Sequence, residues 1–213
     1  MEKILENYKV LLNNINNLSE VHINDLDLNK TGLFIVDMNN GFAKEGVLSS
    51  PRVENIIKPI AHFSKLISSK VNTVVAFTDT HDEDSVEFKS YPTHCLRGEM
   101  ESQLVDEILS IDNMEVLEKN STNGFFVMDM EKYKHLDNFI VVGCCTDICV
   151  YQFVLTLKTY FNQNNLDKNI IVPIDLVETY DIDMIHSGDF LNTVFLNSMI
   201  QNGINVVRKI HLG

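Results

Sequence analysis

The sequence contains no tryptophan, only four prolines and only four cysteines in 213 residues. Three of the four thiols fall within the six residues 144–149, which is not the framework of a secreted disulfide-rich domain, so we expect a reducing cytoplasm. No apolar run is long enough to span a membrane, and the first residues lack the hydrophobic core of a signal peptide. Cationic residues are also scarce. The net charge of -13 argues against nucleic acid or an anionic membrane as a partner.

Hydrophobic residues make up 45% of the chain, which is typical of a globular protein, and we expect a single domain over residues 1–213. Segments rich in Val and Ile alternate with segments of helical periodicity. This alternation predicts a three-layer α/β/α fold, a parallel sheet with helices on both faces. Six strands are expected, at residues 31–38, 71–80, 114–119, 135–143, 169–174 and 204–209.

Helical patterns separate the expected strands. An added N-terminal helix within residues 1–20 either covers the sheet or packs on a second copy of the chain, so the sequence is compatible with a homo-oligomer. Ser50 is expected to cap the next helix, and Pro59 to kink or split it. His186 we interpret as a structural or surface residue. The remaining helices are expected at residues 50–70, 99–110, 147–164 and 181–202.

Three reactive residue types occur where expected strands end. Asp37 follows the first strand, Lys119 ends the third, and Cys149 opens the helix after the fourth. The carboxyl ends of parallel strands share one edge of the sheet, so an acid, a cation and a thiol should meet there. Asp37 could then deprotonate Cys149, while Lys119 keeps Asp37 ionised or stabilises charge on a substrate.

The position of Cys149 at a helix start favours a nucleophile over a packing residue. We expect Thr146 to cap this helix, and its free N–H groups to lower the pKa of the thiol from about 8.5 and to hold an oxyanion. Cys144 ends an apolar strand and should pack in the core. Cys145 is expected to contribute its backbone and not its sulfur.

The polar loop over residues 79–98 contains a candidate metal site. Asp79 and His81 are two apart on an extended segment, so their side chains point the same way. Glu87 and His94 lie within reach of a folded loop. Two histidines with one or two carboxylates suit a divalent metal, with zinc expected first and iron or manganese as alternatives. The competing interpretation is an acidic, solvated loop without a metal.

Four motifs together resemble one family, the isochorismatase-like cysteine hydrolases, and within it the nicotinamidases. The similarity extends over residues 31–208. It depends on VDMNNGF, EKNSTNGF, GCCTDICV and DTHDEDSVEFKSYPTHCLRG, which occur in the family's order.

This resemblance implies an amidohydrolase that converts nicotinamide and water to nicotinic acid and ammonia through a thioester. A divalent metal would orient the substrate ring. The implied roles are catalytic for Asp37, Lys119 and Cys149, metal-binding for Asp79, His81, Glu87 and His94, oxyanion-binding for the backbone of Cys145 and Cys149, and substrate-binding for Phe42 and Asn39.

Two further features follow from the resemblance. The peptide bond before Cys145 is expected to be cis. The acidic segment departs from the family's usual Asp-x-Gln-x-Asp-Phe, because Asn39 stands in place of Gln and Gly41 in place of the second Asp. These departures leave the substrate open among small amides.

Three alternatives remain at the level of sequence. The chain could be an amidase of the same superfamily that acts on another small amide or carbamoyl compound. It could be a non-catalytic relative that keeps the pocket and the metal. An isochorismatase-type vinyl-ether hydrolase fits less well, because such relatives need neither the nucleophilic cysteine nor the metal loop.

Overall fold

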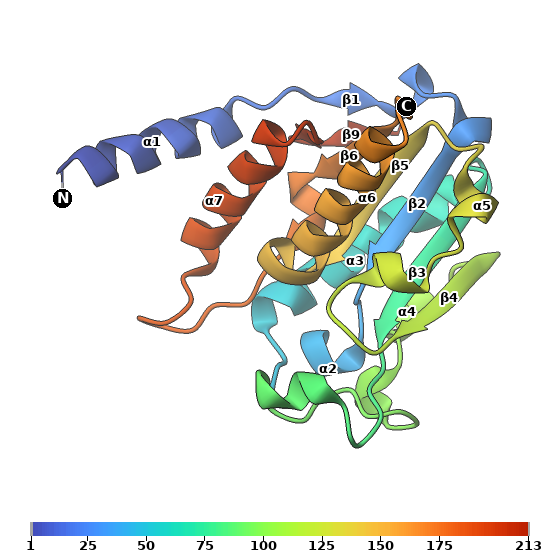
Figure 1. Cartoon of the computed structure of the whole chain (residues 1–213), viewed down its shortest axis with the longest axis vertical. Helices are drawn as coiled ribbons and strands as arrows, with labels where there is room; N and C mark the ends of the chain where they lie inside the picture. The colour runs from blue at the N-terminus through green and yellow to red at the C-terminus, as the bar shows by residue number, and fades with distance from the viewer. Residues whose placement is uncertain (1, 213) are drawn as a thin grey trace.

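The computed structural model describes residues 2–212, so the two ends of the expected domain, residues 1 and 213, lie outside the described part. The fold is a three-layer α/β/α sandwich around a parallel sheet, as predicted (Figure 1). Its strands run in the order β4-β3-β2-β5-β6-β8. These are the six predicted strands, at Met114–Lys119, Thr73–Asp79, Thr31–Val36, Asn138–Cys144, Asn169–Pro173 and Asn205–Val207.

Alternation of side chains along the central strands produces two cores. In β2, Leu33 and Ile35 face one side of the sheet, where helix α3 (Pro51–Ile67) packs, and Phe34 and Val36 face the other. The second side is covered by α6 (Tyr151–Gln163) and α7 (Gly188–Gln201), which lie in front of the sheet in Figure 1. Helices exclude water from both faces of the sheet, which is why the central strands are apolar throughout.

Helix α3 follows the sequence expectation at its start and departs from it in the middle. The Ser50 hydroxyl accepts from the backbone N–H of Arg52 at 3.3 Å, as expected for an N-cap. Pro59 does not split the helix, which is continuous from Pro51 to Ile67.

Two other helices are shorter than predicted. In place of one helix over 99–110, the structure has a 3-10 turn at Met100–Ser102 and the short helix α4 (Asp106–Leu109). The chain between them is extended because Leu104 forms a bridge with Asn39. Helix α7 begins at Gly188 and not at residue 181, because residues 181–187 form a loop.

Several small elements lie outside the predicted pattern. The two-residue strand β7 (Val177–Glu178) pairs with β5, and β1 (Val21–His22) pairs with β9 (Ile210–His211) in a separate two-stranded sheet. Short helices α2 (Asn40–Ala43) and α5 (Met130–Tyr133) complete the fold.

The N-terminal helix α1 (Glu2–Asn16) is present and lies against α7, pointing away from the body of the molecule in Figure 1. Ile15 is its only fully buried residue. Within residues 2–212, no helix has both the length and the apolar character that a membrane span requires.

Candidate active site

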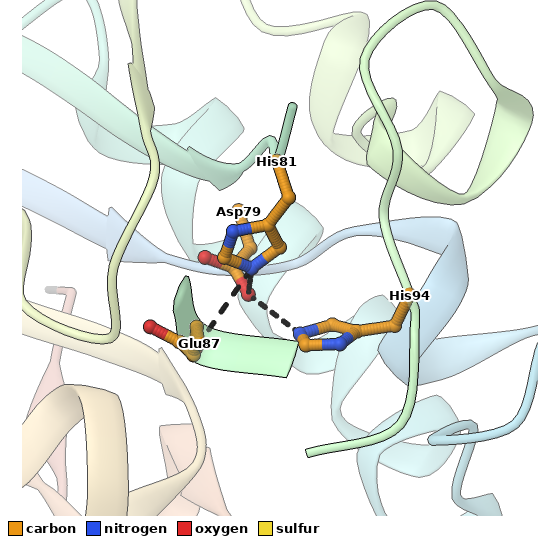
Figure 2. A group of neighbouring side chains, drawn as sticks. All are labelled: Asp79, His81, Glu87 and His94. Atoms are coloured by element: carbon orange, nitrogen blue, oxygen red, sulfur yellow. Dashed lines mark hydrogen bonds and ion pairs between the residues drawn. The ribbon is translucent and has the colours of Figure 1, made fainter. Parts of the chain in front are cut away.

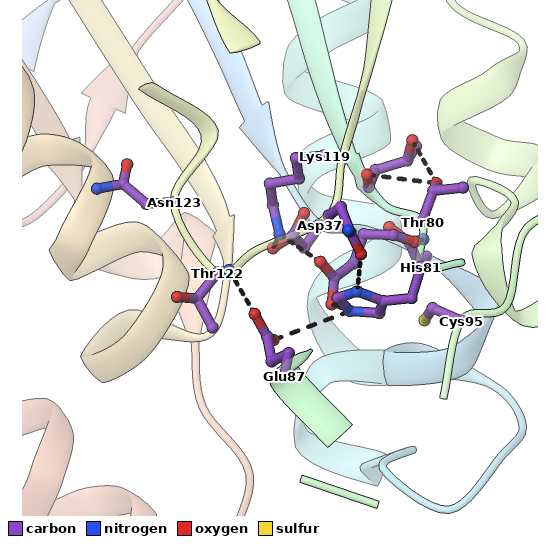
Figure 3. Close-up of polar contacts among 12 residues, drawn as sticks. Asp37, Thr80, His81, Glu87, Cys95, Lys119, Thr122 and Asn123 are labelled. Carbon is purple, nitrogen blue, oxygen red and sulfur yellow. Dashed lines mark hydrogen bonds and ion pairs between the residues drawn. The ribbon is translucent and has the colours of Figure 1, made fainter. Parts of the chain in front are cut away.

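The strand order brings three charged side chains together at the carboxyl edge of the sheet. Asp37 follows β2, Asp79 ends β3 and Lys119 ends β4, and these strands are neighbours. The Lys119 ammonium lies 2.9 Å from Asp37 Oδ2 and 2.7 Å from Asp79 Oδ1, with all three side chains buried (Figure 3). Two buried carboxylates at such short distance need the cation between them, because the desolvation of either charge alone is costly.

Asp37 is placed to act as a base. Burial raises the pKa of its carboxyl to about 7, and the neighbouring Lys119 opposes this rise. Neither carboxylate oxygen has a partner with hydrogen-bond geometry among residues 2–212, although Oδ2 faces Lys119. The backbone of Asp37 adopts a left-handed conformation, with φ at 51°, which is uncommon outside glycine and typical of functional positions. Asp37 can therefore accept a proton from a third group.

Cys149 lies in a π-helical turn, Thr146–Val150, that directly precedes α6. Thr146 is the first residue of this turn and not its N-cap; Cys145 holds that place without a side-chain bond. The peptide bond between Cys144 and Cys145 is cis, as the resemblance implies. Cys144 is buried, and its thiol contacts the Asp37 carbonyl oxygen at 3.1 Å, so the core interpretation of this cysteine is correct.

The expected low pKa of the Cys149 thiol is wrong. Burial, followed by the charge of Asp37, raises its pKa well above the usual value, and Lys119 only partly opposes this. Desolvation of the buried sulfur outweighs the partial charge of a helix start. The resting thiol is therefore protonated, and its proton must move to a base before the sulfur can attack.

Gly143 allows the end of β5, and the turn with Cys149 that follows it, to lie close to the end of β2 and Asp37. Its φ is +118°, and a Cβ there would lie 2.0 Å from the Val36 carbonyl oxygen. A side chain would push β5 away from β2 at the point where both strands end. Only glycine allows this close approach.

The four predicted metal-binding residues form one cluster (Figure 2). The Nε2 atoms of His81 and His94 lie 3.0 Å and 3.1 Å from the same oxygen, Asp79 Oδ2. Glu87 Oε1 lies 3.8 Å from His81 Nε2, and one donor atom of each residue falls within 4.8 Å of the others. The prediction that Asp79 and His81 point the same way is therefore correct.

His94 shows why this cluster fits a cation. Its Nδ1 lies 2.7 Å from the Pro92 carbonyl oxygen, which can only accept, so Nδ1 carries the proton. In the neutral ring, Nε2 then presents a lone pair to the Asp79 carboxylate at 3.1 Å. Two acceptors face each other at this distance only if a proton or a metal ion lies between them. A divalent ion would satisfy both, as well as His81 and Glu87.

The electrostatics of the cluster agree with this. Burial alone would raise the pKa of Asp79, but Lys119 and the two histidines hold it well below the usual range. The Glu87 side chain is fixed by the backbone N–H of Thr122, which donates to Oε2 at 3.1 Å (Figure 3). The carboxylates are thus ionised or oriented for coordination before an ion binds.

Asn39 and Gly41, the two departures from the family pattern, have structural explanations. The Asn39 amide donates to the carbonyl oxygens of Asp79 at 3.0 Å and Ser102 at 2.8 Å. It therefore connects the two ends of the loop that carries the candidate metal ligands. A Cβ on Gly41 would meet the Cys95 sulfur at 2.8 Å, which leaves no room for the family's Asp. Substrate contact by Asn39 stays a prediction.

Aromatic rings surround the metal-binding residues. The predicted substrate-binding residue Phe42 lies 5.7 Å from the His94 ring, and Phe88 lies 5.2 Å from the His81 ring. Tyr91 was not predicted. Its ring centroid lies 6.2 Å from that of His94, and burial, followed by the charge of Cys149, raises the pKa of its hydroxyl. The sequence feature that could have identified Tyr91 was its position three residues before His94.

Comparison with known proteins is consistent with this geometry. The sequence profile of the isochorismatase domain matches residues 31–206. Nicotinamidase 1 of Arabidopsis thaliana is 28% identical over 210 residues, which cover 84% of this chain and 86% of that protein.

Solved structures show the same fold. N-carbamoylsarcosine amidase from Thermoplasma acidophilum superimposes with a TM-score of 0.66 at 27% identity, covering 84% of this chain and 96% of that one. The pyrazinamidase of Pyrococcus horikoshii, solved in complex with zinc, has a TM-score of 0.70 at 20% identity, with coverages of 84% and 99%.

The profile match extends over most of the chain, and the relatives that share its fold include enzymes that cleave amides. The chain belongs to the isochorismatase family, as a nicotinamidase-like amidohydrolase.

Proposed function

We propose that this protein is a nicotinamidase, which hydrolyses nicotinamide to nicotinic acid and ammonia. The observation that carries the proposal is the continuous chain of ionic contacts from Asp37 through Lys119 to Asp79. It connects a base beside a cysteine with a histidine-carboxylate cluster suited to a metal. A site of this kind can bind a ring at one end and attack its carboxamide at the other.

In the proposed reaction, Asp37 accepts the proton of the Cys149 thiol. The thiolate attacks the carboxamide carbon, and the backbone N–H groups of Cys145 and Cys149 hold the resulting oxyanion. The C–N bond breaks as Asp37 returns the proton to the departing ammonia. Water, deprotonated by Asp37, then attacks the thioester carbon, which releases nicotinic acid and restores the thiol.

Lys119 keeps two carboxylates in place during these steps. Burial would lower the pKa of its ammonium, but Asp37 and Asp79 raise it well above the usual value. The cation therefore stays charged while Asp37 gains and loses a proton. It also compensates the negative charge that moves from sulfur to oxygen in the tetrahedral intermediate.

Asp79, His81, Glu87 and His94 would hold one divalent ion. When bound, this ion would supply a Lewis acid to which a pyridine nitrogen such as that of nicotinamide could bind. Zinc is the first candidate, because a neighbour of the same fold was solved with zinc and the donor set suits it. Phe42 would form an apolar wall against the ring.

A second candidate is an amidase of carbamoyl compounds. The similarity to N-carbamoylsarcosine amidase, at 27% identity, favours it. The metal-binding cluster favours nicotinamide, because an aromatic nitrogen gives such an ion a ligand.

Ammonia release from nicotinamide tests the proposal. We expect release by the parent protein and a loss of at least about 10³-fold in kcat for Cys149→Ala, because the nucleophile is removed while the fold is kept. Cys95→Ala is the matched control, because this buried free thiol contacts the Glu101 carbonyl oxygen at 3.4 Å and has no part in the proposed reaction, so the change should leave kcat within a few fold. Full activity in Cys149→Ala would contradict the mechanism. Activity on a carbamoyl compound alone would select the second candidate.

A further inference from the structure

The loop between β7 and α7 is fastened to the turn that carries Cys149. Strand β7 pairs with the end of β5, so that Glu178 lies opposite Cys144. The next residue, Thr179, donates its hydroxyl to Asp147 Oδ1, two positions before Cys149. Arg52 holds the same stretch from α3, with its Nε donating to the Thr179 carbonyl oxygen at 3.1 Å. The chain is thus fixed immediately before Tyr180.

His186 fixes the other end of this loop. Its Nδ1 lies 3.0 Å from the Tyr180 carbonyl oxygen and its Nε2 lies 2.8 Å from Asp147 Oδ2. Both partners are acceptors, so the ring satisfies both only by donating from both nitrogens. The side chains of His186 and Asp147 are 12% and 6% exposed. Such a buried contact is ordered and is stronger than a surface pair.

The Tyr180 ring is held by this arrangement. It stacks on the His186 ring with a centroid distance of 3.7 Å and an interplanar angle of 18°. Burial, with the charges of Asp147, Cys145 and Tyr91, raises the pKa of its hydroxyl to about 12. Because Glu178 lies opposite Cys144 and the Thr179 hydroxyl donates to Asp147, Tyr180 is held at the carboxyl end of β5, next to the turn that carries Cys149.

We propose that Tyr180 is a specificity-determining residue: clamped by His186 and Asp147, its ring closes the side of the substrate pocket next to Cys145 and excludes carboxamides with bulky substituents there. The inference builds on the proposed function, since it names the substrate class as small, flat primary amides. His186 and Asp147 are positioning residues, because they act through Tyr180.

The geometry separates this role from ordinary packing. A tyrosine with a free edge could rotate away from an incoming ligand at little cost. Here Arg52 donates to the Thr179 carbonyl oxygen, and His186 contacts the Tyr180 carbonyl oxygen. The His186 ring also stacks on the face of the Tyr180 ring. Side chains in the loop between Tyr180 and His186 are instead exposed, including Met184 and Ile185. The loop therefore holds one fixed ring next to the turn that carries Cys149 and exposes Met184 and Ile185 to solvent.

Alkylation of Cys149 tests whether the Tyr180 ring closes one side of the pocket, and it does not depend on any amide substrate. Rates with iodoacetamide and with the bulkier N-benzyl iodoacetamide are measured by mass spectrometry of the Cys149 peptide at one pH. Their ratio cancels any change in thiol pKa. We expect Tyr180→Ala to raise the bulky-to-small ratio at least fivefold and His186→Ala to raise it at least twofold. Tyr180→Phe, which keeps the ring, and Ile185→Ala, which changes an exposed neighbour, should leave the ratio unchanged.

The same variants are then assayed for ammonia release from nicotinamide and from nicotinamides methylated on the ring. Tyr180→Ala should gain at least fivefold in the kcat/KM ratio of methylated over unmethylated substrate, through KM. Tyr180→Leu replaces Tyr180→Ala if the latter does not fold, as judged by circular dichroism. An unchanged alkylation ratio in folded Tyr180→Ala and Tyr180→Leu overturns the inference while leaving a nicotinamide-active parent intact. A raised alkylation ratio in Tyr180→Ala, together with a parent protein that does not hydrolyse nicotinamide, would support the role of the Tyr180 ring and reject the proposed function.

Discussion

Lys119 shows at the scale of one residue how a buried charge can serve both stability and chemistry. Its ammonium lies within 2.9 Å of Asp37 and 2.7 Å of Asp79, and the side chain is fully buried. Removing it would leave two carboxylates buried without their cation. Breaking a buried pair of this kind typically costs about 3–5 kcal/mol.

The pH dependence of activity should report on Asp37. Since burial raises its pKa to about 7, the fraction of ionised base, and with it kcat/KM, should fall as the pH drops through about 7. Lys119 lowers the pKa of Asp37, so Lys119→Met should move this acid limb to higher pH. A pH profile of kcat/KM checks both. Lys132→Met, which breaks an exposed pair with Glu115, is the control and should leave the profile unchanged. An acid limb that stays in place in Lys119→Met would argue against Asp37 as the base.

Gly41 tests the explanation for the missing acid in the Asp37 segment. Gly41→Ala should destabilise the protein by about 1–3 kcal/mol, because the new Cβ would meet the Cys95 sulfur at 2.8 Å. Urea unfolding of Gly41→Ala, Cys95→Ala and the double variant measures their coupling. The cost of Gly41→Ala should shrink in the Cys95→Ala background. Additive effects would mean that the Glu101 backbone, and not the sulfur, excludes a side chain.

At the scale of elements, α1 is an addition that the sheet does not need. It contacts α7 through the tilted rings of Tyr8 and Phe190, whose centroids lie 5.2 Å apart, and through Asn197, whose amide donates to the Leu11 carbonyl oxygen at 2.9 Å. Only Ile15 enters the core. The carboxyl ends of the strands, where the site lies, are formed without it.

Deletion of residues 1–16 should therefore leave kcat within about twofold and lower the free energy of unfolding by roughly 1.5–3 kcal/mol, the contribution of one buried Ile side chain. Activity and chemical denaturation together measure this. Deletion of residues 1–6 is the matched control, because the described part of that segment is exposed, and its effect should be within about 0.5 kcal/mol. Loss of activity on removal of residues 1–16 would show that the helix supports the site directly.

At the scale of the whole molecule, metal binding should couple to stability. Asp79 ends β3 and His81 lies two residues further on, while Glu87 and His94 come from the loop after this strand, so one ion would tie this loop to the sheet. Binding at a hundredfold excess over Kd stabilises a folded protein by about 2.7 kcal/mol.

Treatment with a chelator should lower the Tm and abolish nicotinamide hydrolysis, and added zinc, iron or manganese should restore both. Differential scanning calorimetry and metal analysis measure the effect. His94→Ala should lose most of the bound metal, whereas His62→Ala, an exposed histidine on α3, should bind as much as the parent. Equal metal content in both variants would remove His94 from the ligand set.

Much of this protein follows from local pattern alone. Strands β2, β3, β5 and β6 were predictable because a strand buried on both faces must be a short, continuous apolar run, and that run is visible in the chain. The meeting of Asp37, Asp79 and Lys119 was predictable because strand ends in a parallel sheet share an edge, and Glu87 and His94 were candidate metal ligands from the loop that follows Asp79. Cys149 was selected over its neighbours by motif resemblance, and its turn follows the end of β5, which pairs with the end of β2 directly before Asp37.

Other features depended on contacts between distant segments. The 99–110 segment is not one helix, because Val105 donates to the Met38 carbonyl oxygen and Leu104 pairs with Asn39. The raised pKa of Cys149 comes from burial, which no local pattern reports. Strand β7 is two residues long, too short for periodicity, yet its pairing with β5 places Glu178 opposite Cys144, at the end of the strand that leads to Cys149. The sequence by itself determined the fold, through its periodicity, and the family and the candidate reactive residues, through motifs in order along the chain. Only the tertiary structure decided the protonation and spacing of these residues, since both depend on which segments exclude water from one another.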